Sequence, residues 1–329
     1  MARALITGIT GQDGLYLSEQ LLAKGYDVYG LIRGQNNPKR ALVERQVPGV
    51  RLLTGDITDL ASLIRAFGVA RPDEVYNLAA ISFVAYSWEN AKLTSDVTAL
   101  GVLNMLEATR LYAGDDISRV RFYQASSSEM FGKVHEVPQR ETTLLWPRSP
   151  YGVSKVYGHY MTINYRESYG LHASSGILFN HESPRRGPEF VTRKISIAVA
   201  RIALGLQGGV SLGNLDAKRD WGFAGDYTDA MWRMLQADRA DDYVIATGHT
   251  HSIRDFLDIA FARVGVDDWS RHVTVDPAFF RPAEVDELRG DATKALEKLG
   301  WTPTVSFEEL VTMMVDADLA AQRETVRSA

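Results

Sequence analysis

The chain has 329 residues, no cysteine and a formal net charge of −5. The acidic balance argues against nucleic-acid binding, which normally uses a basic surface, and the lack of cysteine excludes disulfides, thiolate metal sites and thiol catalysis. The length suits one large α/β domain, or one such domain with an appended lobe.

Neither a targeting segment nor a membrane span is visible in the sequence. The N-terminus reaches Gly8 too early for the apolar core of a signal peptide, and no apolar run is long enough to cross a bilayer. No metal-ligand spacing such as H-E-x-x-H is present, and a cysteine-free chain fits a reducing compartment. We therefore expect a cytoplasmic protein that binds no membrane and no metal.

A glycine-rich turn follows the first predicted strand, at residues 4–7, and precedes a helical stretch that ends near Gly25. The turn reads Gly8-Ile9-Thr10-Gly11-Gln12-Asp13-Gly14. Strand, glycine turn and helix together are the context of a dinucleotide-binding loop, because glycine lets the backbone approach a pyrophosphate at the helix N-terminus. We expect residues 8–13 to bind a dinucleotide. The alternative is a tight turn without a ligand.

The end of the second predicted strand, residues 28–32, selects between the two nicotinamide cofactors. An acid there binds the ribose 2′-hydroxyl of NAD, whereas an arginine accommodates the 2′-phosphate of NADP. Arg33 stands at this position, with Lys39 and Arg40 nearby. The sequence therefore favours NADP, the alternative being a solvated basic loop.

Two further strands are predicted at residues 50–54 and 74–78, with helical stretches at 59–67 and 94–110. Asp56 and Ile57 follow the first of these strands, where an acid often reaches the adenine. Small residues follow the second strand and would let a flat cofactor lie close, although they also suit a simple packing contact. This stretch is Leu78, Ala79, Ala80, Ile81 and Ser82.

Candidate acid–base groups lie after the fifth apolar run, residues 120–123. Ser127 and Glu129 follow this run, and a helix opens at Ser149-Pro150, a capping residue and a first-turn proline. Tyr151 and Lys155 share one face of that helix. An ammonium beside a phenol lowers the phenol's pKa, so we expect a proton-transfer site if strand end and helix start meet. Tyr-x-x-x-Lys also occurs by chance.

Strands alternating with helices predict a doubly wound parallel sheet. A sixth strand at residues 171–179 leads into a polar loop, 180–187, at the edge where such sheets bind ligands. Basic aromatic turns at 218–223 and 280–284 then suggest a pocket for a diphosphate. We expect a dinucleotide-binding domain over 1–180 and a mainly ligand-binding lobe over 181–329, with some segments returning to the first domain.

These motifs resemble the extended short-chain dehydrogenase/reductase superfamily and, more narrowly, the GDP-mannose 4,6-dehydratase family. The likeness covers nearly the whole chain, and the run from Leu178 to Gly187 is long and specific. The matching runs are 5–14, 122–126, 176–187, 190–194, 219–222 and 280–285.

The resemblance implies a Rossmann-type fold with a smaller, mostly C-terminal substrate lobe and tightly held NADP. It places catalysis on Ser127, Glu129, Tyr151 and Lys155. To the cofactor residues named above it adds Tyr151, Lys155, His181 and Arg186. For GDP-mannose, or a close GDP-sugar, it implies Ser82, Ser127, Glu129, Asn180, Val191, Thr192, Lys194, Arg219, Arg281 and Glu284.

The implied reaction converts GDP-mannose to GDP-4-keto-6-deoxymannose and water, with hydride moving from C4 to C6 through NADP. Tyr151 would take the O4 proton and Glu129 the C5 proton. A nucleotide-sugar 4-ketoreductase or 4-epimerase is the alternative enzyme, and an NADP-sensing module without catalysis is a further alternative. Neither the exact sugar, mannose or a heptose analogue, nor the downstream pathway follows from the sequence.

Two departures from the family pattern bear on these expectations. Many members have threonine where this chain has Ser127, which keeps the hydroxyl but loses the methyl group that restricts its rotamer. Many members also carry a longer arginine-rich loop after the second strand, which helps to assemble tetramers. Here residues 33–38 form a short loop, so we expect either a homodimer or a homotetramer.

Arg33→Ala should narrow or reverse a preference for NADP over NAD, because the guanidinium is the expected partner of the 2′-phosphate. Binding of both cofactors to the parent and the variant measures this. Equal affinity of the parent for the two cofactors would count against the assignment.

Overall fold

The structure is a computed structural model that describes residues 1–34, 36–280, 285 and 287–328. A seven-stranded sheet lies at its centre, in the order β11-β6-β5-β4-β1-β2-β3, and all its pairings are parallel. The expected doubly wound sheet is confirmed. Its strands are β1 (Arg3–Thr7), β2 (Asp27–Ile32), β3 (Arg51–Thr54), β4 (Glu74–Asn77), β5 (Arg121–Ser127), β6 (His172–Leu178) and β11 (Asp242–Ile245).

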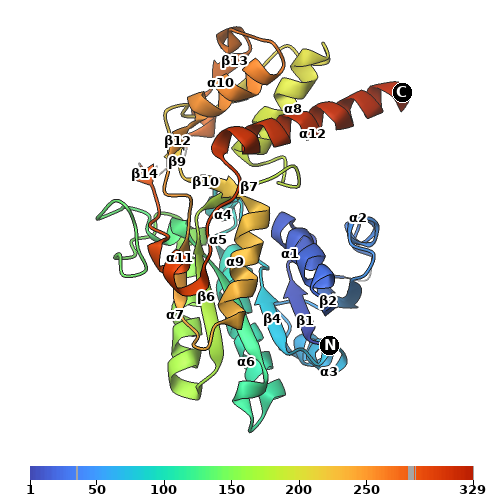
Figure 1. Ribbon diagram of the computed structural model, residues 1–329, viewed down its shortest axis with the longest axis vertical. Coiled ribbons are helices and arrows are strands. Elements are labelled where there is room, and N and C mark those ends of the chain that lie inside the picture. Colours follow the sequence, from blue (N-terminus) through green and yellow to red (C-terminus); the bar gives the residue numbers. More distant parts are fainter. Residues whose placement is uncertain (35, 281–284, 286, 329) are drawn as a thin grey trace.

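Helices cover both faces of this sheet (Figure 1). Alternate residues of β1 point to opposite faces, so Ala4 and Ile6 join one apolar core and Leu5 joins the other. The first core is closed by α1 (Gln12–Ala23), α2 (Arg40–Gln46), α9 (Ala224–Gln236) and α11 (Thr293–Leu299). The second is closed by α3 (Leu60–Ala70), α6 (Gly101–Ala113) and α7 (Pro150–Tyr169).

The single helix expected over 94–110 is wrong in one respect. The chain forms α5 (Ala91–Ser95), then a π-helical turn over Asp96–Leu100, and only then α6. A π turn inserts an extra residue and re-aims the side chains around it. Here it places the Thr98 hydroxyl 3.1 Å from the main-chain nitrogen of Ile81, which donates to it.

A second group of elements forms a smaller lobe beyond the carboxyl ends of the strands (Figure 1). Its core lies among α8 (Val191–Ala203), α10 (Ile253–Arg263) and α12 (Phe307–Ser328). The turn expected at 218–223 instead contains two short strands. The short strands outside the large sheet are β7 (Asn180–Glu182), β8 (Val210–Leu212), β9 (Lys218–Arg219), β10 (Trp221–Phe223), β12 (His251–Ser252), β13 (Val273–Val275) and β14 (Glu287–Leu288).

The division into domains at residue 180 stays a prediction. β7 begins at that residue and pairs with β10, whereas β11, α9 and α11 come from the C-terminal half and pack on the large sheet. Among the residues that the structure describes, no helix is both long and apolar enough to span a membrane.

Gly14→Ala should destabilise the protein by about 2 kcal/mol, the usual cost of overpacking. A Cβ on Gly14 would lie 2.6 Å from both the Gly8 carbonyl oxygen and the Ile9 Cα, and backbone atoms cannot move aside cheaply. Gly68→Ala is the matched control: this exposed position in α3 has nothing within 4 Å of an added Cβ. It should gain about 0.5–1 kcal/mol. Urea unfolding measures both, and equal effects would contradict the explanation.

Candidate active site

A cavity of about 1390 Å³ lies between the carboxyl ends of the sheet strands and the smaller lobe. Its walls combine the glycine loop, the stretches after β2, β3, β4 and β5, the start of α7, and the segment from β7 into α8. Ligands of open parallel sheets bind at this edge, where the strand order reverses. The order reverses here at β1, between β4 and β2.

The glycine loop forms a cradle that only glycine permits. Gly8 has φ +70°, and a Cβ there would lie 2.9 Å from Ala79 N. The Thr7 hydroxyl accepts the main-chain N–H groups of Leu78 and Ala79, both at 3.1 Å, which holds β4 against the loop. The open N-terminus of α1 follows, so these residues fit a pyrophosphate.

Ile9 is the one residue expected at the cofactor whose side chain is absent from the cavity wall. It is fully buried, and its side chain packs where a Cβ on Gly30 would be, in the core beneath the loop. Its side chain therefore does not line the cavity. The other expected cofactor residues line the wall: Gly8, Thr10, Gly11, Gln12, Asp13, Arg33, Asp56, Ile57, Leu78, Ala79, Ala80, Ile81, Ser82, Tyr151, Lys155, His181 and Arg186.

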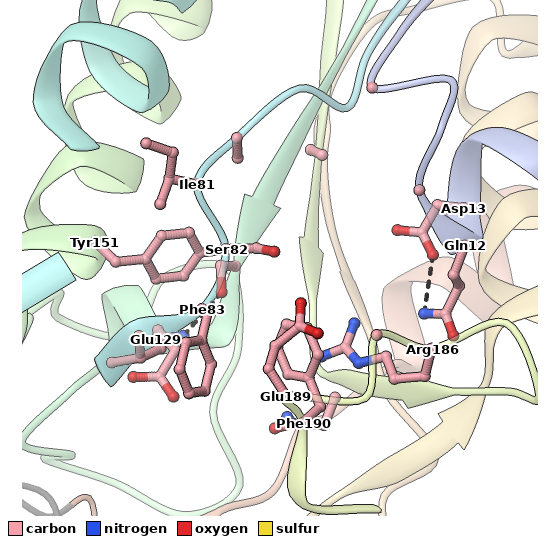
Figure 2. A pocket seen from close by; sticks show the side chains of 18 of the residues that line it. Gln12, Asp13, Ile81, Ser82, Phe83, Glu129, Tyr151, Arg186, Glu189 and Phe190 are labelled. Carbon is pink, nitrogen blue, oxygen red and sulfur yellow. Dashed lines mark hydrogen bonds between the residues drawn. The ribbon is translucent and has the colours of Figure 1, made fainter. Parts of the chain in front are cut away.

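The four expected catalytic residues meet at one wall of the cavity. Ser127 ends β5, and its hydroxyl accepts the main-chain N–H of Glu129 at 3.2 Å. Tyr151 and Lys155 lie in the first turns of α7, which Ser149 caps by accepting from Gly152 N at 3.0 Å. Figure 2 shows Tyr151, Ser82 and Glu129 on the same side of the cavity.

A buried ladder of hydrogen bonds runs from the glycine loop to Lys155. Thr7 Oγ1 donates to Asn77 at 2.7 Å, and Asn77 Nδ2 donates to Gln124 at 2.8 Å. Gln124 Nε2 donates to the Ala125 carbonyl oxygen at 3.0 Å, and Lys155 Nζ donates to that same oxygen at 2.7 Å. The ladder therefore fixes the position of the Lys155 ammonium next to Ala125 on β5.

The expected low pKa of the phenol is wrong for these residues taken alone. Burial raises the pKa of Tyr151 to about 12, although a hydrogen bond with Ser127 and the nearby Arg186 oppose the rise. Burial also lowers the pKa of Lys155 to about 8. The ammonium lies 5.7 Å from the centre of the Tyr151 ring and points to the Ala125 carbonyl, so it does not offset the desolvation of the phenolate.

The lobe-side residues lie opposite this wall. Thr192 donates to the buried Glu182 at 2.6 Å, and Arg186 pairs with the same carboxylate at 3.1 Å. Lys194 Nζ donates to the Ser211 carbonyl at 2.7 Å and lies 3.9 Å from the Phe279 ring centre. Asn180 and Val191 complete the expected lining on this side.

Arg219 lines the cavity from β9 but is largely buried. Its guanidinium donates to the carbonyl groups of Lys218 and Val285, at 2.7 and 3.0 Å. Arg281 and Glu284, the other two residues expected at the substrate, lie outside the described residues.

Two aromatic residues in the cavity were not predicted from the sequence. Phe83 and Phe190 contact each other edge to face, with ring centres 5.8 Å apart, and Arg186 lies 3.6 Å from the Phe190 ring centre. Figure 2 also shows Glu189 beside Arg186. Phe83 directly follows Ser82, and Phe190 precedes Val191, so proximity to expected site residues was the available signal.

Comparison with known proteins identifies the family. The model of the GDP-mannose 4,6 dehydratase family matches residues 5–314. GDP-mannose 4,6 dehydratase 1 of Arabidopsis thaliana is 54% identical, covering 98% of this chain and 91% of its own. The human GDP-mannose 4,6 dehydratase is 48% identical, covering 97% and 92%.

The chain belongs to the GDP-mannose 4,6-dehydratase family. The family named from the sequence motifs is therefore confirmed. A solved UDP-glucose 4-epimerase of Thermus thermophilus, described as a complex with NAD, shares the dehydratase fold with a TM-score of 0.82 and 30% identity. That match covers 97% of this chain and 99% of the epimerase.

In this dehydratase-family chain, Lys155→Met should remove a pH-dependent part of stability. The pKa of Lys155 falls from 10.5 to about 8 on folding, so the unfolded chain binds more protons between those values and the lysine's contribution to stability rises with pH there. The free energy of unfolding of the parent, minus that of the variant, should rise by about 2–3 kcal/mol across the window. Chemical unfolding at several pH values measures it, and a constant difference would contradict the buried-charge account.

Proposed function

We propose that this protein is a GDP-mannose 4,6-dehydratase that converts GDP-mannose to GDP-4-keto-6-deoxymannose and water, with resident NADP. One observation carries the proposal: in a member of this family, Glu129 shares a cavity wall with Tyr151 and Lys155. A nucleotide-sugar reductase or 4-epimerase needs the tyrosine and lysine but has no use for an acid at Glu129.

The residues present fit NADP. Residues 8 and 10–13 line the cavity at the start of α1, where a helix N-terminus favours a pyrophosphate, and residues 78–82 line the neighbouring wall. Arg33 and Lys39 line the cavity beyond β2, where they favour a 2′-phosphate. When bound, NADP supplies the group that accepts hydride from the sugar and returns it, so no net oxidation occurs.

Tyr151 takes the proton of the sugar O4 as C4 becomes a ketone. Because burial raises the pKa of this phenol to about 12, the phenolate needs added positive charge close to the ring. Arg186 already acts in this direction, and an oxidised nicotinamide in the cavity would add a further positive charge. Ser127 donates to the phenolate oxygen and so favours the charged form.

Glu129 acts after the ketone exists, since a 4-keto group acidifies the neighbouring C5 proton. Its carboxylate removes that proton, and the C6 hydroxyl leaves as water with a proton from Glu129 or Ser127. As hydride returns to C6, C5 regains a proton, which is balanced by the release of the one that Tyr151 took from O4. The two steps thus use different residues from one wall. Tyr151 is matched to the O4 proton and Glu129 to the C5 proton.

The sugar nucleotide would span from this wall to the lobe. Ser82, Ser127 and Glu129 would contact the hexose, while Lys194 and Arg219 would supply positive charge to the diphosphate. Val191 and Thr192, which line the cavity at the start of α8, would contact the guanosine end of the substrate.

Location in the cytoplasm is also part of the proposal. A chain without cysteine gains nothing from an oxidising compartment and suits a reducing one. Fractionation of producing cells tests it, and enzyme recovered with secreted or membrane material would count against it.

Incubation with GDP-mannose and no added reductant tests the reaction class, since the product should be lighter by one water. To separate the two protons, Tyr151→Phe should prevent formation of reduced-nicotinamide absorbance, whereas Glu129→Gln should show that absorbance and then stall. Loss of the Glu129 base should slow turnover by about 10²–10⁴. The stalled variant should not exchange the C5 proton with deuterated water. Normal turnover by Glu129→Gln, or cofactor reduction by Tyr151→Phe, would contradict these roles.

We further propose a homodimer, or a homotetramer built from it, through α5, α6 and α7. Large apolar side chains are exposed along these helices at helical spacing. Monomeric proteins rarely expose apolar side chains grouped in this way. They are Leu93, Leu111, Val153, Tyr157, Tyr160 and Tyr169, and Leu100 at the end of the π turn is exposed as well. A second copy packing its own helices on this face would form a four-helix contact.

Val153→Glu should weaken or abolish the dimer, because a charge would be buried in the contact. Val69→Glu is the matched control, since Val69 on α3 is 61% exposed and Val153 is 56% exposed. Sedimentation at micromolar concentration measures the mass of both. A monomeric parent, or equal dissociation by the two variants, would reject this interface.

A further inference from the structure

The last two side chains of the glycine loop bind to strand β7 of the smaller lobe. Gln12 Nε2 donates to the His181 carbonyl at 2.9 Å, and Ser183 donates to Gln12 Oε1 at 2.7 Å. Asp13 Oδ2 lies 2.9 Å from His181 Nε2. Gln12 is 7% exposed and His181 8%, so the contacts are buried. Residues 168 positions apart thus form one cluster.

The partners of His181 determine its charge. Nδ1 lies 2.7 Å from the Phe179 carbonyl oxygen, which only accepts, so Nδ1 carries a hydrogen. Nε2 faces a carboxylate oxygen, which also accepts, so Nε2 carries one too. A ring with both hydrogens is an imidazolium. Burial and Arg186 lower the pKa of His181, but Asp13 outweighs them and the pKa is raised.

Charged and titratable groups reach this ring from each neighbouring element. Asp13 comes from α1, Arg186 from the loop after β7, and Tyr227 from α9, stacked at 4.6 Å between ring centres. Arg186 also pairs with Glu182, at 3.1 Å. Asp13 contacts His181 directly. An aromatic face beside an imidazolium also favours its charge.

We propose that the Asp13–His181 ion pair is a positioning element that locks the glycine loop to β7 and makes NADP retention depend on pH. The inference rests on the proposed function, since it assumes that NADP occupies the loop. β7 also carries Asn180 and leads to Arg186, so the lock sets the distance between the cofactor and substrate sides of the cavity. A cofactor restored within each turnover needs such a hold between cycles.

The sign of the pH dependence follows from the pair. His181 has a raised pKa, so the stability that its charge gives the pair is complete below the ordinary imidazole value of 6.5 and is lost as pH rises through the raised pKa. Asp13 has a lowered pKa, so the stability that its carboxylate gives the pair is lost only as pH falls into the acid range. The pair is therefore complete between the ordinary values of 3.8 and 6.5, and NADP affinity should be highest there and fall as pH rises through the raised pKa of His181.

Calorimetric binding of NADP alone to cofactor-free enzyme tests this, at pH values on both sides of neutrality. Asp13→Asn keeps the shape and removes the charge, and His181→Gln removes the cation. Each should weaken NADP binding by about 10- to 100-fold near neutral pH, as expected for breaking a buried pair. Each should also flatten the alkaline fall. Because both changes break the same pair, their effects should not add: the double variant should bind NADP as tightly as the single variant with the lower affinity.

Glu19→Gln is the matched control. Glu19 binds Arg185, in the loop after β7, at 2.7 and 2.9 Å and does not line the cavity. It should leave the pH profile of NADP binding unchanged. Nitrogen NMR of the parent should find both ring nitrogens of His181 protonated at neutral pH, which tests the pair even if a variant fails to fold.

Unchanged NADP affinity in a folded Asp13→Asn, a singly protonated His181 at neutral pH, or a Glu19→Gln profile as flat as that of Asp13→Asn would each overturn the inference. A parent that binds no NADP at any pH overturns the proposed function as well. The parent's own binding curve tells that failure apart from failure of the pair alone.

Discussion

The hydrogen-bond ladder from Thr7 through Asn77 and Gln124 to Lys155 is the constraint on which the cavity depends. It crosses three neighbouring strands, β1, β4 and β5, at their carboxyl ends, and its polar side chains are almost fully buried. A buried polar group without its partner is costly, so such a chain admits one arrangement of the strands. The cradle at Gly8 and the ammonium at Lys155 are therefore set by the same register.

Buried carboxylates attach the smaller lobe to this frame. Asp220 accepts the main-chain N–H groups of Thr247 and Gly248, at 2.8 and 2.9 Å, and Asp226 accepts that of Thr304 at 2.8 Å. Within the lobe, Arg193 pairs with the buried Asp318, which joins α8 to α12. These contacts are directional, unlike apolar packing, so they fix where α8 presents Thr192 and Lys194 to the cavity.

The sequence predicted the parts of the fold that follow from local pattern. Apolar runs and the glycine turn located the strands and the cradle within a few residues, and the spacing of Tyr151 and Lys155 placed both on the wall of one cavity. Burial is set by the whole structure, so the raised pKa of Tyr151 and the core position of Ile9 could not be read from neighbours in the chain. The contact of Phe83 with Phe190 joins residues far apart in sequence and carries no local signature.

Glu129 stands in a three-residue turn, Ser128–Met130, while Tyr151 and Lys155 stand on a separate helix. The base proposed for the elimination and the pair proposed for the hydride step thus come from different segments of the chain, which meet in the folded cavity. Substitution of the Glu129 side chain alone would remove the proposed eliminating base while the tyrosine and the lysine stay on their own helix. Under these proposed roles, a single position in a three-residue turn sets whether elimination follows the first hydride step.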